Sequence, residues 1–306
     1  MDIGEGASPI ADPRRLTFDL PALGPGAHLA GLEFGDPARP FDLVFLHANG
    51  FNAMTYRDVL APLAGRLHIL ALDQQGHGRS PQRTPIEGRQ SWADMRLDLE
   101  VLLDQLDGPP VVLAGHSLGG AVSLFVAAER PDRVQALALF DPVIPSAAML
   151  AQLLEVESPT TRGNVLAEGA LRRRAVFPSR ATAIDSYRGR GPFKTWPDAA
   201  LRGYVEDGFV DRPDGQVELA CAPAWESSNF SAHKHDSWAF VAALKVPTTI
   251  LRAAMGSTCS LTSEDQLPAA VPRRHVETIA DSTHFLPIER PELTRATLLA
   301  ACKPPL

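Results

Sequence analysis

Ser117 is the residue of this chain whose neighbours best fit a chemical role. It is the central residue of segment 115–119, which reads Gly-His-Ser-Leu-Gly. Four apolar residues, 111–114, precede this segment and predict a buried strand, and the apolar run 121–128 predicts a helix that ends before Pro131. So tight a turn from a strand into a helix forces the backbone of its central residue into a strained conformation. It also leaves no room for larger side chains at the positions of the two glycines. The pattern predicts a nucleophilic serine at the edge of a sheet; a purely structural glycine-rich turn is the alternative.

A serine hydroxyl is a weak nucleophile near neutral pH and needs a base within hydrogen-bonding distance. In this topology the base is expected after the last strand, and His284 directly follows the expected strand 274–279. His68 lies within an expected strand, whereas His233 and His235 lie in the middle of the chain and could contact a substrate. His284 is therefore the predicted base, with an ordinary loop histidine as the alternative.

The base needs a carboxylate that fixes its tautomer and stabilises the imidazolium. The loop after the seventh expected strand, 252–259, contains no carboxylate, but the sixth strand ends in Asp141 and Pro142. Asp141 is therefore the predicted acid, and the order along the chain is nucleophile, acid, base. An Asp-Pro turn is the alternative interpretation. Glu264 and Asp265 are fallback acids, although they are expected to begin a helix.

An oxyanion is stabilised by backbone N–H groups. Leu118, directly after the serine, is expected to supply one of them. The loop after the third expected strand, 47–51, is expected to supply the other, with Asn49 as the first candidate and Gly50 as the second. A plain Asn-Gly turn is the alternative. The glycine-rich segment 73–80 is expected to have a structural role rather than a catalytic one. Its glycines lack the spacing of a dinucleotide-binding or phosphate-binding loop.

Short apolar runs that alternate with helical segments must position these residues. The alternation predicts an α/β fold with a mainly parallel sheet covered on both faces, whose first two strands form an antiparallel pair. The expected strands are 16–20, 28–34, 43–47, 67–73, 111–115, 134–140, 248–251 and 274–279. The expected helices are 55–63, 91–106, 119–130, 264–270 and 292–301.

The alternation stops after Asp141 and resumes near residue 248. This interruption predicts a core of residues 1–141 and 237–306 and an inserted helical cap of residues 142–236; a separate domain is the alternative. Aromatic side chains of the insertion could line an acyl or aryl pocket, but the preferred interpretation is that most form the core of the cap itself. They are Phe177, Phe193, Trp196, Tyr204, Phe209, Trp225 and Phe230.

The composition of the 306 residues, with 45% hydrophobic and 21% charged, is that of a globular chain. The net charge of −7 and the absence of a basic cluster argue against a nucleic-acid partner. No run approaches the roughly 20 apolar residues of a membrane span. Residues 1–15 lack the pattern of an export signal, and Cys221, Cys259 and Cys302 are widely spaced, which predicts free thiols, no metal site and a cytoplasmic location.

Four segments together resemble the α/β-hydrolase fold superfamily over about residues 16–301: 46–51, 73–80, 115–120 and 283–292. The resemblance implies an eight-stranded, mostly parallel sheet flanked by helices. The chain departs from the common pattern twice. Ala48 replaces the glycine of the usual His-Gly turn, and the acid is expected after the sixth strand, as in some members of the superfamily.

The resemblance implies a serine hydrolase that cleaves a small-molecule carboxylic ester through an acyl-enzyme, with no cofactor or metal. Ser117 argues against the cleavage of epoxides or carbon–halogen bonds, since the members with those activities carry an aspartate nucleophile. An acyltransferase and a carbon–carbon or amide hydrolase are alternatives that the same triad supports. A scaffold without chemistry is disfavoured because the serine, histidine and aspartate are all present.

Overall fold

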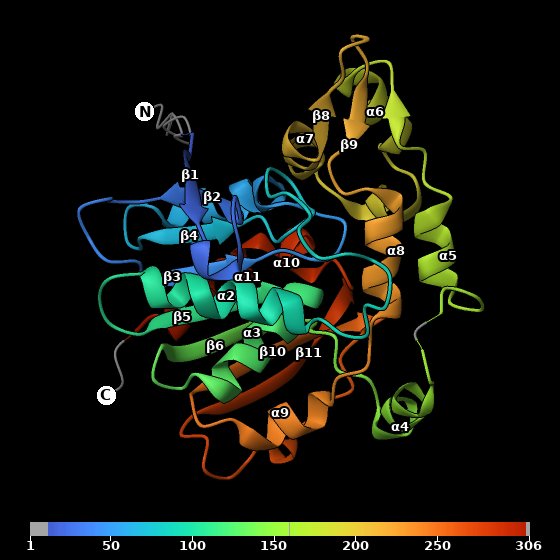
Figure 1. The fold of residues 1–306 in the computed structure, drawn as a ribbon. Helices are drawn as coiled ribbons and strands as arrows, with labels where there is room; N and C mark the ends of the chain where they lie inside the picture. Colours follow the sequence, from blue (N-terminus) through green and yellow to red (C-terminus); the bar gives the residue numbers. More distant parts are fainter. Residues whose placement is uncertain (1–11, 159, 304–306) are drawn as a thin grey trace.

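An eight-stranded sheet forms the centre of the molecule in the computed structural model, which describes residues 12–158 and 160–303 (Figure 1). Most of the N-terminal segment considered above, residues 1–11, lies outside the described residues. The strand order is β1-β2-β4-β3-β5-β6-β10-β11. The pairs β1–β2 and β2–β4 are antiparallel, and all the other pairs are parallel.

All eight strands expected from the sequence are present in this sheet. Their bounds are β1 Arg14–Asp19, β2 His28–Phe34, β3 Leu43–Leu46, β4 Ile69–Leu72, β5 Val111–His116, β6 Val134–Phe140, β10 Thr248–Met255 and β11 Arg274–Thr283. His68 directly precedes β4 instead of lying within it.

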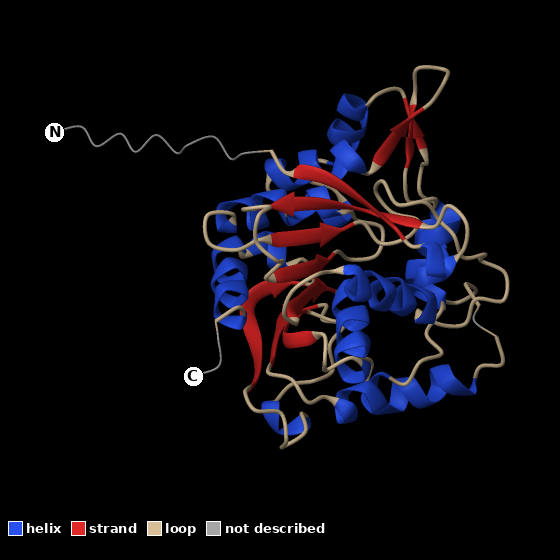
Figure 2. Cartoon of the chain, turned by 60° about the vertical axis from the view of Figure 1, so that its left-hand side comes forward, coloured by secondary structure: helices blue, strands red, loops and turns tan. Residues whose placement is uncertain are grey.

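Helices cover both faces of the sheet, as Figure 2 shows. Alternate residues of a strand point to opposite faces, so Val44 and Leu46 of β3 join one buried cluster and Leu43 and Phe45 join the other. The first cluster includes side chains of α2 (Ala93–Gln105), α3 (Leu118–Glu129) and α9 (Ser237–Ala243). The second includes side chains of α1 (Arg57–Leu60) and α11 (Pro291–Ala301). This double coverage explains why the inner strands β3, β4, β5 and β6 are apolar at nearly every position, whereas the edge strand β11 is mostly polar.

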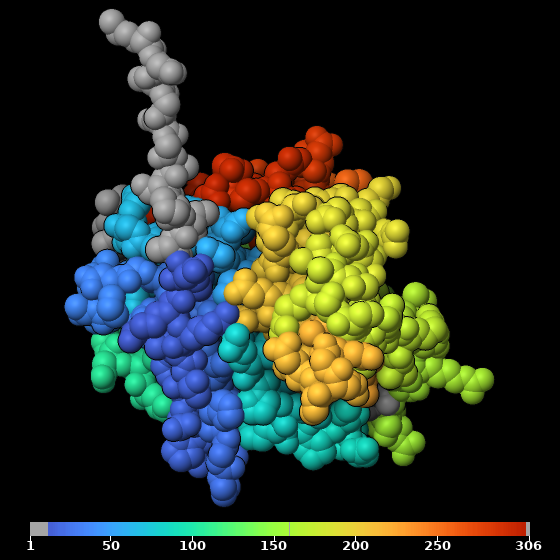
Figure 3. All heavy atoms as spheres, turned by 90° about the horizontal axis from the view of Figure 1, so that it is seen from above, coloured from blue at the N-terminus to red at the C-terminus, as the bar shows by residue number. Residues whose placement is uncertain are grey.

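The segment between β6 and β10 contains most of the remaining elements. Its helices before α9 are α4 Ala147–Glu155, α5 Val165–Leu171, α6 Arg180–Tyr187, α7 Asp198–Asp207 and α8 Pro223–Ser231. In Figure 1 they gather at one end of the sheet, and in Figure 3 their yellow-green and gold atoms lie against the cyan atoms of residues that follow β4. The division into a core and a cap of residues 142–236 stays a prediction.

The insertion contains short strands as well as the expected helices. A small sheet with the order β7-β9-β8 joins Val176–Phe177, Val217–Leu219 and Phe209–Asp211. The reason lies in the Arg-Pro-Asp-Gly turn of residues 212–215, where Gly215 has a φ of 79° and donates its N–H to Arg212 at 3.0 Å. Proline and glycine at these positions favour a tight turn, which returns β9 alongside β8.

The prediction of a helix over residues 264–270 is wrong, because only a short 3-10 turn, Glu264–Gln266, forms there. Leu267 is extended, with a ψ of 149°, and precedes Pro268. Because the residue before a proline disfavours the helical region, the turn cannot continue as an α-helix. A further short helix, α10 (Leu286–Glu289), follows His284 and leads into α11.

The described part of the chain contains no helix long and apolar enough to cross a membrane. Within the same residues, no group of three or more histidine, cysteine or acidic side chains could hold a metal ion. Cys221, Cys259 and Cys302 are free thiols, as the sequence predicts.

Candidate active site

Ser117 lies in the turn between β5 and the N-terminus of α3. Its backbone has a φ of 56° and a ψ of −119°, a region that residues other than glycine rarely occupy. A Cβ atom at Gly115 would lie 2.5 Å from the carbonyl of Gly119, and one at Gly119 would lie 2.5 Å from the carbonyl oxygens of Leu46 and His47. The two glycines therefore allow β5, α3 and the end of β3 to approach so closely that the strained serine is held in place.

Ser117, His284 and Asp141 form one hydrogen-bonded chain. His284 Nε2 lies 3.0 Å from Ser117 Oγ, and His284 Nδ1 lies 2.6 Å from Asp141 Oδ2. Because the carboxylate accepts a hydrogen from Nδ1, Nε2 of the neutral ring is free to accept the serine proton. The three side chains come from the ends of β5, β6 and β11, which meet at the same edge of the sheet.

Asp141 is fully buried directly after β6, with a φ of 44°. Its Oδ1 accepts hydrogen bonds from the N–H of Ala253 at 2.9 Å and from the hydroxyl of Ser257 at 2.5 Å. Burial alone would raise the pKa of this carboxyl group. The hydrogen bond from His284, the attraction of its charge when the ring is protonated, and these donors together outweigh burial and hold the pKa of Asp141 below its usual value.

The loop after β10 takes part in the site although it contains no carboxylate. The N–H of Thr258 donates to Asp141 Oδ2 at 3.0 Å, and the hydroxyl of Thr258 donates to the carbonyl oxygen of Asp141 at 2.9 Å. Ser257 and Thr258 were not among the residues predicted from the sequence, in which this loop stood out only by its missing acid. Two adjacent hydroxyl residues at the end of a strand, opposite the predicted acid, were the available signal.

Leu118 and Asn49 are the predicted oxyanion donors. Leu118 is the first residue of α3, where backbone N–H groups have no acceptor within the helix. Neither its N–H nor that of Asn49 makes a hydrogen bond to a described residue. The neighbouring amides are engaged, since Ala48 donates to Tyr56 Oη at 3.3 Å and Gly50 donates to His77 Nε2 at 3.0 Å. Of Ala48, Asn49 and Gly50, Asn49 is therefore the residue whose amide has no partner in the described part of the chain and is available to a ligand.

The side chain of Asn49 is held by α8. Asn49 Nδ2 donates to the carbonyl oxygen of Glu226 at 3.0 Å, and Asn49 Oδ1 accepts from Nδ2 of Asn229 at 2.8 Å. The sequence analysis did not identify Glu226 or Asn229. Their positions in a helical stretch far along the chain gave no signal that they contact the loop after β3.

His116 lies beside the triad but makes different contacts. Its Nδ1 lies 2.7 Å from Tyr56 Oη, and its Nε2 lies 2.6 Å from the carbonyl oxygen of His284. Burial and, next, the neighbouring His284 lower the pKa of His116 to about 3, so this ring is neutral. Such a ring can donate to the backbone of His284 and accept from Tyr56, which makes it a structural support for the histidine.

The remaining candidates of the sequence analysis lie outside the triad. His68 bonds to Glu33 at 3.0 Å, and the rings of His233 and His235 pack on Trp92 with centroids 4.9 Å and 4.6 Å away. Glu264 and Asp265, the fallback acids, are exposed. Segment 73–80 is bound to the rest of the core by Asp73, which accepts from the N–H of Ala53 at 2.8 Å.

Most aromatic side chains of the insertion are buried together, in a cluster that they share with Phe45 and Tyr56 of the α/β core. Trp196 extends this cluster toward the triad, since its ring centroid lies 4.9 Å from Phe51 and 5.6 Å from Phe285. The other aromatic side chains of the insertion in this cluster are Phe177, Phe193, Tyr204 and Phe209. Trp225 belongs instead to the cluster on the opposite face of the sheet.

An open groove of about 730 Å³ is lined by residues that contact Ser117 and Asp141, although neither of these two lines it. Val143 lines it and also donates its N–H to the carbonyl oxygen of Ser117 at 3.2 Å, and Ser257 and Thr258 line it beside the acid. Apolar side chains from α4 and α5 and their flanks supply much of its remaining surface: Met149, Leu153, Val156, Val165 and Leu166. The groove has the size of a small-molecule pocket.

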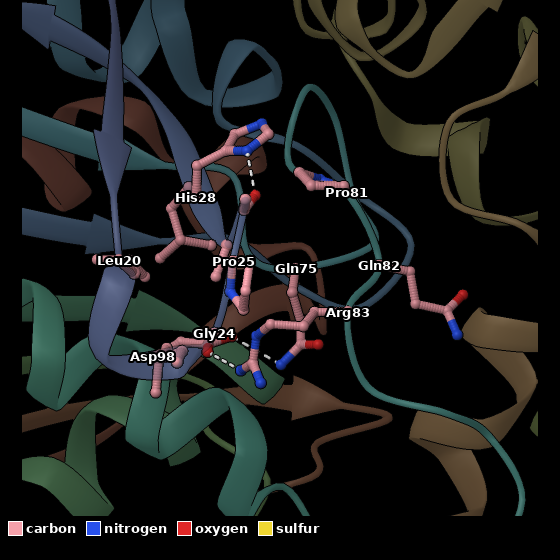
Figure 4. A pocket seen from close by; sticks show the side chains of 13 residues that line it. Leu20, Gly24, Pro25, His28, Gln75, Pro81, Gln82, Arg83 and Asp98 are labelled. Atoms are coloured by element: carbon pink, nitrogen blue, oxygen red, sulfur yellow. Dashed lines mark hydrogen bonds and ion pairs between the residues drawn. The ribbon is translucent and has the colours of Figure 1, made fainter.

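A second cavity, of about 330 Å³, lies between the β1–β2 hairpin and the segment after β4. Figure 4 shows Gln75, Arg83 and Asp98 pointing toward one another in it. Arg83 forms an ion pair with Asp98, and Gln75 Nε2 donates to Asp98 at 2.6 Å. The polar groups of these three side chains are thus hydrogen-bonded to one another. None of the five predicted site residues lines this cavity.

Comparisons with known proteins agree with this architecture. Lipase LipV of Mycobacterium tuberculosis is 47% identical over 78 residues, which are 25% of this chain and 28% of that lipase. Monoglyceride lipase of Rattus norvegicus is 33% identical over 199 residues, 60% of this chain and 63% of the lipase. The matches thus span less than two thirds of these relatives.

The crystal structure of E-2-(acetamidomethylene)succinate hydrolase is similar to the whole fold. Its TM-score is 0.73 at 21% identity, over 94% of this chain and 98% of that one. A family model described as "Alpha/beta hydrolase family" matches residues 43–297. Since that match covers most of the sequence, the chain belongs to the alpha/beta hydrolase family.

Proposed function

We propose that this hydrolase cleaves carboxylic esters of small molecules through an acyl-enzyme on Ser117. The observation that carries the proposal is the hydrogen-bonded chain from Ser117 Oγ through His284 to Asp141. The names of two relatives, a lipase and a monoglyceride lipase, support ester substrates.

In the first half-reaction, Ser117 Oγ attacks the ester carbonyl while His284 Nε2 takes its proton. Asp141 stabilises the imidazolium without itself becoming protonated, in accord with its lowered pKa. The amides of Leu118 and Asn49 stabilise the oxyanion. His284 then protonates the departing alcohol, which leaves the acyl group on Ser117.

In the second half-reaction, water attacks the acyl-enzyme with His284 as its base. The bond between the acyl group and Ser117 Oγ then breaks, the proton on His284 returns to Oγ, and the carboxylic acid leaves. The side chain of His284 is 22% exposed, so water can reach it, which favours hydrolysis over acyl transfer to another alcohol. The groove beside Val143 offers space for the apolar part of the ester. An ester with an apolar chain is therefore the substrate class that fits best.

The test is the hydrolysis of p-nitrophenyl esters from acetate to palmitate by the protein and by Ser117→Ala. The substitution is expected to lower kcat by about 10⁶-fold, since the reaction loses its nucleophile, and to leave the melting temperature nearly unchanged. A fluorophosphonate should label the parent protein and fail to label the variant. Ester hydrolysis retained by Ser117→Ala would refute the mechanism. Labelling of Ser117 without ester hydrolysis would point to acyl transfer or to carbon–carbon bond cleavage.

A further inference from the structure

Asn229 of α8 lies at the centre of a buried polar chain that ends at the oxyanion loop. The chain begins at Asp94, which accepts from Nε and Nη2 of Arg89 at 2.9 Å and 3.0 Å. Arg89 Nη1 donates to Asn229 Oδ1 at 2.6 Å, and Asn229 Nδ2 donates to Asn49 Oδ1 at 2.8 Å. Asn49 Nδ2 then donates to the carbonyl oxygen of Glu226. Asn229 is completely buried.

The orientation of every amide in this chain follows from Arg89. A guanidinium group only donates hydrogen bonds, so the atom of Asn229 that faces it must be the oxygen. The NH₂ group of Asn229 must then face Asn49, which directs the oxygen of Asn49 toward Asn229 and its NH₂ group toward Glu226. The side chain of Asn49 is therefore held in a single orientation by partners that all lie outside its own loop.

Helix α8 is itself fixed to the core, so it can serve as a rigid support. Trp92 Nε1 donates to the carbonyl oxygen of Asn229 at 3.0 Å, and Trp225 Nε1 donates to that of Gln75 at 3.0 Å. The guanidinium of Arg89 lies over the ring of Trp225, 4.3 Å from its centroid. A Cβ at Gly50 would lie 2.6 Å from Glu226 Oε1, so the loop after β3 packs directly against this helix.

We propose that Asn229 is a positioning residue that fixes the oxyanion-stabilising N–H of Asn49. The inference rests on the proposed function, since it requires an oxyanion at this amide. Oxyanion donors act because they are already oriented before the charge develops. The N–H of Asn49 has no partner of its own in the described part of the chain, so its position depends on what holds the residue, and Asn229 holds the side chain through a charge-assisted chain. The insertion thus contributes to the chemical step itself, besides shaping the pocket.

The variant that tests this is Asn229→Asp. An aspartate can still accept from Arg89, but as a carboxylate it cannot donate to Asn49. The expected result is a kcat for p-nitrophenyl acetate lowered about 10-fold to 100-fold with KM changed less than about threefold, because an oxyanion contact acts on the transition state.

The matched control is Ser228→Ala. Ser228 also contacts Arg89 Nη1, at 3.3 Å, but has no bond to Asn49. Its kcat should stay within about twofold of the parent, because the orientation of Asn49 is untouched. A kcat of Asn229→Asp within twofold of the parent, or an equal loss in Ser228→Ala, would overturn the positioning role.

If Asn229→Asp does not fold, a second variant, Asn49→Ala, tests the same proposal. It removes the side chain that is held and leaves the backbone amide and Arg89 in place. A similar fall in kcat at constant KM would support the inference, and an unchanged kcat would overturn it. Where both single variants fold, the double variant should lose no more activity than either single one, because both act on one contact.

Labelling of the parent protein by a fluorophosphonate distinguishes a failure of the positioning role from a failure of the proposed function. If the parent is labelled at Ser117 and Ser117→Ala is inactive, an unaffected Asn229→Asp refutes the positioning role alone. If the parent is not labelled and Ser117→Ala remains active, the proposed function fails and the positioning role fails with it.

Discussion

At the residue scale, Asp141 combines its proposed role as the acid of the site with several hydrogen-bond donors. Both of its carboxylate oxygens accept backbone N–H groups, from Ala253 and Thr258, in addition to His284 and the hydroxyl of Ser257. These donors fix the plane of the carboxylate as well as its charge. A rigid carboxylate gives the histidine a single tautomer and a single ring orientation.

The substitution Asp141→Asn is expected to lower kcat about 10³-fold to 10⁴-fold, because the amide no longer selects the tautomer of His284 that accepts the serine proton. It should also lower the free energy of unfolding by about 1–3 kcal/mol, because the NH₂ group must face one of the backbone donors and leave it unsatisfied. Ester hydrolysis and urea unfolding measure the two effects.

The control for this substitution is Asp265→Asn, which alters one of the fallback acids. Asp265 is exposed and contacts only its own turn among the described residues, so neither activity nor stability should change. Full activity in Asp141→Asn together with a loss in Asp265→Asn would move the acid to the 264–265 turn.

At the scale of elements, the β5–α3 turn depends on how closely backbones approach. A Cβ at Gly119 would meet the rigid carbonyl groups of Leu46 and His47, whereas a Cβ at Gly169, within α5, meets nothing within 4 Å. The same chemical change, glycine to alanine in a helix, should therefore have opposite effects at these two positions.

Gly119→Ala is expected to lower the free energy of unfolding by at least about 1–3 kcal/mol, because the neighbouring backbones must move apart. Gly169→Ala should raise it by about 0.5–1 kcal/mol, because alanine restricts the unfolded chain and favours the helix. Urea midpoints of the two variants give the comparison. Equal stabilities would mean that the turn is looser than the distances indicate.

The elements that the sequence predicts are those whose signal is local. The inner strands of the large sheet are short apolar runs. Ser117 and Asp141 directly follow two of them, and His284 follows the last strand, so topology alone brings the three residues to one edge. Their catalytic roles stay predictions, but their proximity is what the sequence analysis expects.

The features that the sequence did not reveal depend on contacts between distant segments. Asn229 lies 180 residues from Asn49 along the chain, and Ser257 lies 116 residues from Asp141. From the sequence alone, polar residues on a helix or in a loop are expected to face solvent, because their distant partners cannot be recognised. The small sheet of the insertion was missed for a related reason, since strands of two or three residues are too short for an alternating pattern to stand out.

At the scale of the whole molecule, buried and partly buried histidines make stability depend on pH. Burial lowers the pKa of five of them: to about 4 for His47 and His233, to about 3 for His116 and His235, and well below its usual value for His77. In the unfolded chain each ring titrates near pH 6.5, as a roughly unperturbed histidine. Between about pH 4 and 6.5 the unfolded state therefore binds protons that the folded state does not.

Two buried carboxyl groups act in the opposite direction. Burial raises the pKa of Asp73 and Asp98 to about 7, so between about pH 4 and 7 the folded state holds protons that the unfolded state has released. Five histidines outnumber two carboxyl groups, so unfolding takes up protons over this range. Stability rises with pH wherever the unfolded state binds more protons.

The free energy of unfolding is therefore expected to increase from about pH 4.5 to about 6.5 and to level off near pH 7–8, where these groups carry the same charge in both states. Urea midpoints at four pH values in this range, with an unchanged m-value, measure it. His235→Gln removes one of the five histidines and should make the rise shallower. A decline in stability over the same range would show that Asp73 and Asp98, rather than the histidines, dominate the proton balance of the fold, and the variant would then leave the slope unchanged or make it steeper.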